Sequence, residues 1–325
     1  MRAMQFTEYG GPDRLQESEI APPAIGSDGV LISVLASSIN PIDWKLASGK
    51  LRMVMPVSRP ATPGFDVVGT VVELGSAVTG FAVGQRVVAR IAESPGGACA
   101  ELCVATLDQV TALPEGVDPE SAAALPLAGM TALQALRDNC GLKLSGETRR
   151  VLIVGASGGV GHYAVQIAAA SGAHVTGVCS TPNVELVRDL GADVVIDYRK
   201  QSGFETDGLY DIILDCADSH GWDAFVSVMA PRSVLALSTP GPAWLPRVAL
   251  QSLSSKKVKM VMLKPNAKDL ALLLGRMANG ELRSVVGARY PMEQLSSAWT
   301  LAQKGGFQGK IVMLPFGAQP ESSLP

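Results

Sequence analysis

The sequence predicts an α/β fold in which a doubly wound parallel sheet is inserted in a β-rich domain. Two observations lead to this prediction. Residues 151–178 read as an apolar strand, a glycine-rich turn, a helix and a second apolar strand. Strand and helix patterns then alternate, whereas the first 125 residues hold short strands separated by Gly and Pro. We therefore expect one domain over 1–125 plus 284–325 and a second domain over 126–283.

The first domain is β-rich. Short apolar or alternating runs predict strands at Val30–Leu35, Val67–Leu74 and Gln85–Ala89. Ser121 to Leu136 has a helical composition, with Pro126 and Gly129 near its start. The end of the chain returns to a strand–helix–strand pattern at Val285–Tyr290, Met292–Gln303 and Lys310–Leu314. We expect this last segment to fold back onto the first domain.

The second domain alternates strands with helices. Strands are expected at 151–154, 174–178, 194–197, 211–214, 233–237 and 258–263. Helices are expected at 159–171, 183–190, 220–229 and 267–279. Such alternation predicts a parallel sheet with helices on both faces.

The glycine turn is the most informative motif in the chain. The candidate residues share one short loop at the start of a helix and are Gly155, Ala156, Ser157, Gly158, Gly159, Val160 and Gly161. Glycines permit a tight turn and let backbone N–H groups approach phosphate oxygens, and a helix N-terminus adds orphan donors and partial positive charge. The strand–turn–helix–strand context indicates a Rossmann-type site for a dinucleotide, although a bare structural turn is the alternative.

The cofactor class follows from a missing acid. Dinucleotides with a free ribose 2′-hydroxyl usually meet Asp or Glu about 20 residues after the turn. This chain has Val178-Cys179-Ser180-Thr181 there, and small hydroxyls tolerate a 2′-phosphate that a carboxylate would repel. The pattern favours NADP(H). Alternatively, the ribose contact comes from elsewhere, and Arg199 and Lys200 after the third strand are candidates for the positive charge.

Composition excludes several classes of protein. The 325 residues are 47% hydrophobic and 18% charged, with a formal net charge of −3 and a pI near 5.7, so no polycationic surface for nucleic acid is expected. We expect no membrane-spanning helix and no signal peptide, because no apolar run is long enough. Five scattered cysteines predict reduced thiols in a cytoplasmic protein.

Several spaced blocks resemble one known family. They are SSINPIDWKLASG (37–49), PGFDVVGTVVELGSAVTGFAVGQRV (63–87), LPLAGMTALQAL (125–136), GASGGVG (155–161) and Gly309-Lys310. Together they resemble the medium-chain dehydrogenase/reductase superfamily, in its zinc-free quinone oxidoreductase-like branch, and within it the homologues of chloroplast-envelope quinone oxidoreductase. The resemblance implies a GroES-like first domain, NADPH-dependent reduction of α,β-unsaturated ketones, and a homodimer.

The resemblance also bears on metal binding. Zinc-dependent relatives use a Cys and a His-Glu pair as catalytic ligands, and the corresponding positions here hold Asn40 and Phe65-Asp66. Cys99 and Cys103 are too few to close a four-ligand structural site. We expect no metal.

The resemblance supplies candidate catalytic residues, each with an ordinary structural alternative. Asn40 matches an amide beside the nicotinamide, or is a turn residue before Pro41. Lys45 would stabilise an enolate, or is a solvated lysine. Asp43 is expected to cap the helix that Pro41 begins, with a direct chemical role as the lesser alternative. Thr131 matches a hydroxyl at the nicotinamide end of the cofactor, or is a buried helix residue.

Further residues are expected at the binding surfaces. Trp44, Met53 and Met55 are candidates for an apolar substrate wall, with a place in the core as the alternative. The other cofactor candidates lie after strands or in matching motifs and are Ser180, Asn183, Tyr198, Cys216, Ser238, Thr239 and Lys310. His162 is expected to be a packing residue. Two family features are missing: a basic residue after the second strand, where Pro182-Asn183 stands, and a tyrosine within residues 44–55.

The expected activity is hydride transfer to an activated C=C bond or a quinone. The five tyrosines form no Tyr-x-x-x-Lys, which disfavours metal-free alcohol oxidation, whereas reduction of a polarised double bond needs only positioning and donors to the carbonyl oxygen. An enoyl-thioester reductase is one alternative, for which Arg52, Arg59 and Arg247 would have to bind the carrier. A non-catalytic, NADPH-binding redox sensor is another. The apolar edge strand near residue 258 predicts pairing with a second copy.

Overall fold

The chain forms two compact units. The structure, a computed structural model, describes residues 1–204, 208–249 and 255–319. The first unit is Met1–Leu127 with Pro265–Pro325, and the second is Ala128–Lys264. The expected helix near 267–279 forms as α8 (Ala267–Ala278), but it belongs to the first unit, where it contacts β7 (Val110–Ala112). Its apolar stripe, which includes Leu270 and Leu273, is buried there, so the second boundary falls at 265 rather than 284.

The first unit is built on a seven-stranded sheet. Its strand order is β14-β15-β3-β4-β5-β7, with β6 also paired to β3. The remaining bounds are β3 (Gly29–Ser38), β4 (Asp66–Leu74), β5 (Arg86–Arg90), β6 (Leu102–Thr106), β14 (Val286–Pro291) and β15 (Lys310–Leu314). A separate hairpin pairs β1 (Arg2–Phe6) with β2 (Leu15–Glu19).

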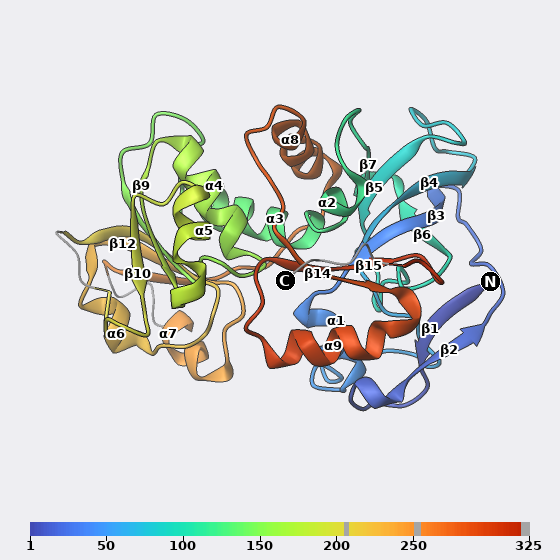
Figure 1. Cartoon of the computed structure of the whole chain (residues 1–325), viewed down its shortest axis with the longest axis horizontal. Helices are drawn as coiled ribbons and strands as arrows, with labels where there is room; N and C mark the ends of the chain where they lie inside the picture. The colour runs from blue at the N-terminus through green and yellow to red at the C-terminus, as the bar shows by residue number, and fades with distance from the viewer. Residues whose placement is uncertain (205–207, 250–254, 320–325) are drawn as a thin grey trace. The chain divides into compact units, whose positions relative to one another are not determined.

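The end of the chain completes this sheet. Strand β15 runs antiparallel to β3, with Val312 opposite Ser38, so the red end of the chain lies beside the blue strands in Figure 1. Helix α9 (Leu295–Lys304) precedes β15 and buries Leu295, Ala298 and Trp299 in the core of the unit. Helix α1 (Pro41–Ala47) starts two residues after β3 ends, which places its first turn at the junction of β3 with β15.

The second unit contains the doubly wound parallel sheet. Its order is β10-β9-β8-β11-β12-β13, and every pairing is parallel. The strands are β8 (Arg150–Val154), β9 (His174–Cys179), β10 (Val194–Asp197), β11 (Tyr210–Asp215), β12 (Met229–Leu237) and β13 (Lys257–Met260). The order reverses between β8 and β11, which creates the switch point where ligands bind in such sheets.

Among the described residues of this unit, four α-helices flank the sheet. They are α4 (Gly161–Ser171), α5 (Val184–Asp189), α6 (Trp222–Val226) and α7 (Leu245–Ala249). Helices α4 and α5 contact β8, β9 and β10, whereas α6 and α7 contact β12 and β13, and Figure 1 separates the two pairs. Right-handed crossovers put the pairs on opposite faces because the chain winds outward in both directions from β8.

Two expected helices differ from what the composition indicates, one being shorter and the other divided. The helix expected at 220–229 stops at Val226, because Met229 is fully buried and pairs with Tyr210 as the first residue of β12. The helix expected at 121–136 is divided into α2 (Pro119–Ala123) and α3 (Pro126–Gln134), since Pro126 lacks the N–H that continuity requires. Within the described residues, no helix has the length and apolarity to cross a membrane.

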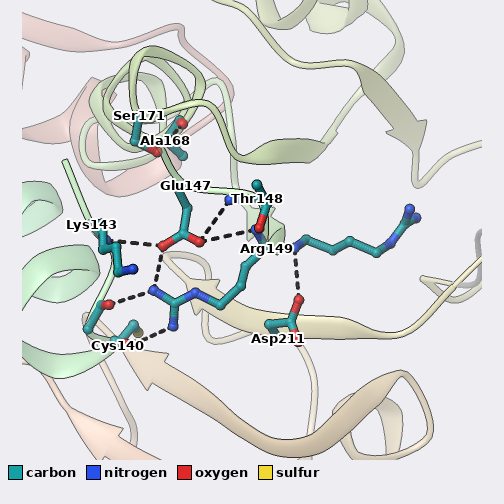
Figure 2. A network of polar contacts seen from close by, with 10 residues as sticks. Cys140, Lys143, Glu147, Thr148, Arg149, Ala168, Ser171 and Asp211 are labelled. Atoms are coloured by element: carbon teal, nitrogen blue, oxygen red, sulfur yellow. Dashed lines mark hydrogen bonds and ion pairs between the residues drawn. The ribbon is translucent and has the colours of Figure 1, made fainter. Parts of the chain in front are cut away.

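The buried carboxylate of Glu147 holds the loop that precedes the parallel sheet of the second unit (Figure 2). Glu147 accepts hydrogen bonds from the backbone N–H groups of Lys143, Thr148 and Arg149 and from the Arg149 guanidinium. The Arg149 side chain also donates to the carbonyls of Cys140 and Gly141. The Arg149 guanidinium and the three backbone donors together lower the pKa of Glu147 to about 2, against the opposing effect of burial. This network fixes the loop that leads into β8.

Candidate functional site

The glycine turn between β8 and α4 has the backbone geometry of a phosphate-binding loop. Gly155 has φ = +78°, in the left-handed region that favours glycine. At Gly161 a Cβ atom would lie 2.1 Å from the carbonyl oxygen of Gly155, so only glycine permits this approach at the start of α4. His162 is fully buried, and its Nδ1 lies 2.8 Å from the Gly158 carbonyl oxygen, as expected of a packing residue.

A polar bridge joins this turn to the loop after β9. Asn183 Nδ2 donates to Ser157 Oγ at 2.9 Å and to Ser180 Oγ at 3.1 Å. Asn183 is 8% exposed, so this amide is fixed between the two hydroxyls. The bridge brings together three of the expected cofactor residues and leaves no acid at the end of β9, where a ribose-binding carboxylate would stand.

Other expected cofactor residues lie at the carboxyl edge of the same sheet. Tyr198 follows β10 and is 55% exposed. Cys216 follows β11, is partly buried and donates its N–H to the Val154 carbonyl. Ser238 and Thr239 follow β12, and both are partly buried. Parallel strands end on one edge, so these side chains gather where an open α/β sheet binds its ligand.

The first unit holds a buried polar cluster around Asn40, at the start of α1. Asp66 Oδ2 accepts hydrogen bonds from Ser38 Oγ and from Asn40 Nδ2, each at 2.8 Å. Its Oδ1 accepts from the N–H of Leu127 at 3.0 Å. Lys310 Nζ donates to the carbonyl oxygen of Ile39 at 2.8 Å and to Asn40 Oδ1. The Lys310 ammonium also lies 3.7 Å from Asp66 Oδ2, so the cluster contains a buried ion pair.

The orientation of the Asn40 amide is fixed by its neighbours. A lysine ammonium only donates and an ionised carboxylate only accepts, so the amide oxygen must face Lys310 and the NH₂ group must face Asp66. The NH₂ group also lies 3.4 Å from the Ser38 carbonyl oxygen. Asn40 is 1% exposed. Both ends of the amide therefore have partners within the unit.

Asp43 closes the first turn of α1. Its Oδ2 accepts the Asn40 N–H at 2.7 Å, the helix-capping role expected from the sequence. Its Oδ1 is buried without a hydrogen-bond partner. Burial, opposed by the Asn40 N–H, Lys310 and Arg90 and assisted by the Asp66 carboxylate, raises the pKa of Asp43 to about 7. Asp43 thus takes up a proton near neutral pH.

Two cations share this interior with the two carboxylates. Burial lowers the pKa of Lys310, although Asp66 and Asp43 oppose the change. Burial also lowers the pKa of Arg90, whose guanidinium stacks 4.6 Å from the centre of the Phe65 ring. Removing one partner of such a buried pair costs about 3–5 kcal/mol, because the other charge is left uncompensated.

The remaining catalytic and substrate candidates differ in burial and in surroundings. Lys45 is half-buried on α1, and its ammonium has no ion-pair partner among the described residues. Trp44 and Met55 pack against the hydrophobic core of the first unit, the alternative considered for both. Met53 is 89% exposed. Thr131 is 7% exposed on α3, in the second unit.

Sequence reasoning did not find the ion pair or the role of Asp66. The sequence points to Asp66 only as a replacement for a metal ligand and to Lys310 as a cofactor contact. The available signal was two charged residues inside strand-like apolar runs, Asp66 at the start of β4 and Lys310 at the start of β15. Buried charges need partners, so the two could have been paired on that ground.

Two of the three basic residues considered for a thioester carrier stack on aromatic rings. The Arg59 guanidinium stacks 4.0 Å from the centre of the Tyr9 ring, and that of Arg247 stacks 3.7 Å from the Trp222 ring. Arg52 is exposed. Arg52 and Arg59 belong to the first unit and Arg247 to the second.

Two family models match the chain. Residues 26–116 match the alcohol dehydrogenase GroES-like domain, which covers most of the first sheet. Residues 190–313 match the zinc-binding dehydrogenase model.

Similar proteins extend the likeness to nearly the whole chain. A chloroplast envelope quinone oxidoreductase homologue of Arabidopsis thaliana is 37% identical, covering 97% of this chain and 98% of the relative. An NADPH-dependent chloroplastic alkenal/one oxidoreductase of the same plant is 30% identical, covering 97% of this chain and 80% of the relative. A mycobacterial protein solved in complex with NADPH is 28% identical with a TM-score of 0.83, covering 97% of this chain and all of that one.

The donor set at Asn40 and Asp66 does not fit the zinc named in one family description. Zinc sites in proteins use thiolate, imidazole and carboxylate ligands. Here an amide and a phenyl ring stand at two of the expected ligand positions, and the Lys310 ammonium already occupies the amide oxygen. Over residues 1–204, 208–249 and 255–319, no group of three or more His, Cys, Asp or Glu side chains could hold a metal ion.

Proposed function

The chain belongs to the medium-chain dehydrogenase/reductase superfamily, in its quinone oxidoreductase-like branch, and from this premise we propose that it is a zinc-independent, NADP(H)-dependent reductase of activated C=C bonds or quinones. The observation that carries the proposal is likeness over 97% of the chain to quinone and alkenal/one oxidoreductases, together with a cation–amide–carboxylate cluster in place of metal ligands. Substrates would be α,β-unsaturated ketones, aldehydes or quinones.

The glycine turn and its neighbours fit NADP(H). Gly155–Gly161 would hold the pyrophosphate at the N-terminus of α4, through backbone N–H groups and the helix dipole. Ser180 and Asn183 would take the phosphorylated ribose, since β9 itself ends without the carboxylate that binds a free 2′-hydroxyl. Tyr198 would lie on the adenine side, and Cys216, Ser238 and Thr239 toward the other end of the cofactor. Relatives that bind or use NADPH by name support this cofactor.

The residues of the chain would polarise the substrate rather than carry the hydride, which NADPH supplies when bound. Reduction of a polarised C=C bond moves negative charge onto the carbonyl oxygen. Lys45 is the candidate that meets this charge, since its half-buried ammonium has no carboxylate partner among the described residues. Asn40 and Asp43 would shape the loop that presents Lys45, because both fix the first turn of α1. Thr131 would contribute a hydroxyl at the cofactor.

The test is oxidation of NADPH, followed by its absorbance, with a panel of substrates. The panel holds an acyclic enone, an alkenal, a para-quinone, a crotonyl thioester and a saturated ketone, and each is repeated with NADH. Turnover of the enone, alkenal or quinone without turnover of the saturated ketone supports the proposal. Preferred turnover of the thioester would replace it with an enoyl-thioester reductase. NADPH binding without any turnover would favour a cofactor-binding redox sensor.

We also propose a cytoplasmic homodimer. All five cysteines are free thiols, and burial raises the pKa of Cys99, Cys103 and Cys140, as suits a reducing compartment. Plant relatives are chloroplastic by name, so fractionation of the source cells into cytoplasm and organelles is the test of location. The dimer would form through β13, which lies at the edge of the parallel sheet.

A further inference from the structure

We propose that Lys310 is a positioning residue of the reductase: paired with Asp66, it holds the Asn40 amide and so fixes the start of α1, the helix that carries Lys45. The inference rests on the proposed function and gives Lys310 a different role from the cofactor contact that the sequence led us to expect. It concerns contacts within the first unit only.

The first step is the commitment of the Lys310 ammonium. Lys310 is 4% exposed, and its Nζ binds the Ile39 carbonyl and Asn40 Oδ1, with Asp66 at 3.7 Å. Two of its three N–H donors are therefore used on consecutive residues at the end of β3, and the third faces a carboxylate. None is left for a phosphate or a substrate oxygen.

The second step is the effect on Asn40. Its oxygen is held from β15 through Lys310, its NH₂ group from β4 through Asp66, and its backbone N–H from α1 through Asp43. Two strands that are distant in sequence, together with the first turn of α1, thus converge on one residue. Asn40 sits immediately before Pro41, the first residue of α1, so its orientation sets the direction in which α1 leaves β3.

The third step is the link to chemistry. Lys45 lies on α1 four residues after Pro41, about one helical turn from the anchored end. A donor that stabilises developing charge must be held within a fraction of an ångström of its productive position. Loosening Asn40 should therefore slow the chemical step while leaving cofactor binding, which uses the second unit, unchanged.

The experiment compares Lys310→Met, Lys310→Arg, Asp66→Asn and the double variant Lys310→Met/Asp66→Asn in the full chain. The matched control is Glu147→Gln, which removes a carboxylate buried as deeply in a network of the second unit (Figure 2). Each protein is measured for thermal stability, NADPH affinity by fluorescence titration, kcat and KM for the enone, and hydrogen exchange over residues 38–48.

We expect Lys310→Met to lower kcat about tenfold or more, with KM and NADPH affinity within about threefold of wild type. Lys310→Arg should recover part of kcat, since a guanidinium can reach the same acceptors. The double variant should recover stability, because no lone charge is buried, but not kcat. Hydrogen exchange should rise over 38–48 in Lys310→Met and not in Glu147→Gln, although both lose stability.

Two results would overturn the inference. One is a folded Lys310→Met protein with kcat within about twofold of wild type. The other is a double variant in which kcat returns together with stability, since Lys310 would then serve only to neutralise Asp66. If the wild-type protein reduces no member of the panel, the proposed function fails instead, and hydrogen exchange over 38–48 alone decides whether Lys310 anchors Asn40.

Discussion

At the scale of single residues, the cluster in the first unit combines four buried charges that have different partners. Asp66 is saturated, with Ser38, Asn40 and the Leu127 N–H on its two oxygens. Asp43 is not, because one of its oxygens has no hydrogen-bond partner. The under-satisfied carboxylate of Asp43 is suited to take a proton, whereas both oxygens of Asp66 are used as acceptors. Environment, rather than residue type, thus divides their roles.

This difference predicts a pH-dependent contribution of Asp43 to stability. In the folded protein the Asp43 carboxyl keeps its proton up to about pH 7, whereas an aspartate in the unfolded chain loses its proton near about pH 4. Between these values the folded state holds more protons, so the free energy of unfolding falls as pH rises, by up to about 1.4 kcal/mol per pH unit, and levels off above pH 7. Asp43→Asn should remove this slope, because the amide oxygen still accepts the Asn40 N–H without titrating.

The measurement is urea denaturation of both proteins at a series of pH values from about 5 to about 8. The stability of wild type relative to Asp43→Asn should decline across this range and reach a plateau at its upper end. Parallel pH profiles for the two proteins would show that Asp43 does not titrate there.

Asn183 provides a second prediction at this scale, on cofactor choice. Its amide occupies the place after β9 where some relatives in the family carry a basic residue. Asn183→Lys would add a cation beside Ser180, so the ratio of kcat/KM for NADPH to that for NADH should rise about tenfold.

Asn183→Ala is the control, because it breaks the same two hydrogen bonds and adds no charge. It should weaken both cofactors alike. Steady-state kinetics with each cofactor would decide, and an unchanged ratio in Asn183→Lys would place the 2′-phosphate away from this loop.

At the scale of elements, the joint between β8 and α4 depends on a close approach of two peptide units. The α-carbon of Gly161 faces the Gly155 carbonyl, where an added Cβ would stand 2.1 Å from the oxygen and 2.8 Å from the carbon. The atoms met are backbone, so they cannot rotate away. Gly161→Ala should therefore displace the turn, cost about 1–3 kcal/mol of stability and weaken NADPH binding by about tenfold or more.

Gly158→Ala is its matched control in the same loop. There the nearest atom, the Gly155 carbonyl oxygen, would lie 3.3 Å from the new Cβ, a contact that a shift of a few tenths of an ångström relieves. Thermal unfolding and fluorescence titration with NADPH should rank wild type and Gly158→Ala close together and Gly161→Ala well below. Equal behaviour of the two alanine variants would contradict the steric explanation.

The elements also show what could be predicted from the sequence. The strand–turn–helix unit at 151–178 was predictable because apolar period and glycine spacing are local signals, and α4 and β9 form where they indicated. The end of α6 could not be predicted, because Met229 joins β12 through a tertiary pairing with Tyr210 that no local pattern encodes. The Lys310–Asp66 pair was missed for the same reason, since 244 residues separate partners that only the fold brings together (310 − 66).

At the scale of the whole molecule, the chain leaves the first unit once and returns once. The crossings fall at Leu127–Ala128, within α3, and at Lys264–Pro265. The second crossing lies earlier than expected, because α8 is amphipathic and its sequence alone does not say which core buries its apolar stripe. The proposed division of labour, cofactor in the second unit and polar cluster in the first, follows this topology.

The parallel sheet of the second unit also predicts how two copies would associate. Strand β13 pairs with no strand other than β12 in the described sheet, although its Met260 carbonyl accepts from Asn139 Nδ2, and Met262 just beyond it is 72% exposed. A two-fold axis beside β13 would join two sheets and cover this methionine.

Met262→Glu would put two like charges near the axis and should shift a dimer to monomers without loss of fold. Light scattering over a range of protein concentrations gives the mass, and circular dichroism checks the fold. A wild-type protein of monomer mass at all concentrations would refute the dimer, and a dimeric Met262→Glu protein would move the interface away from this edge.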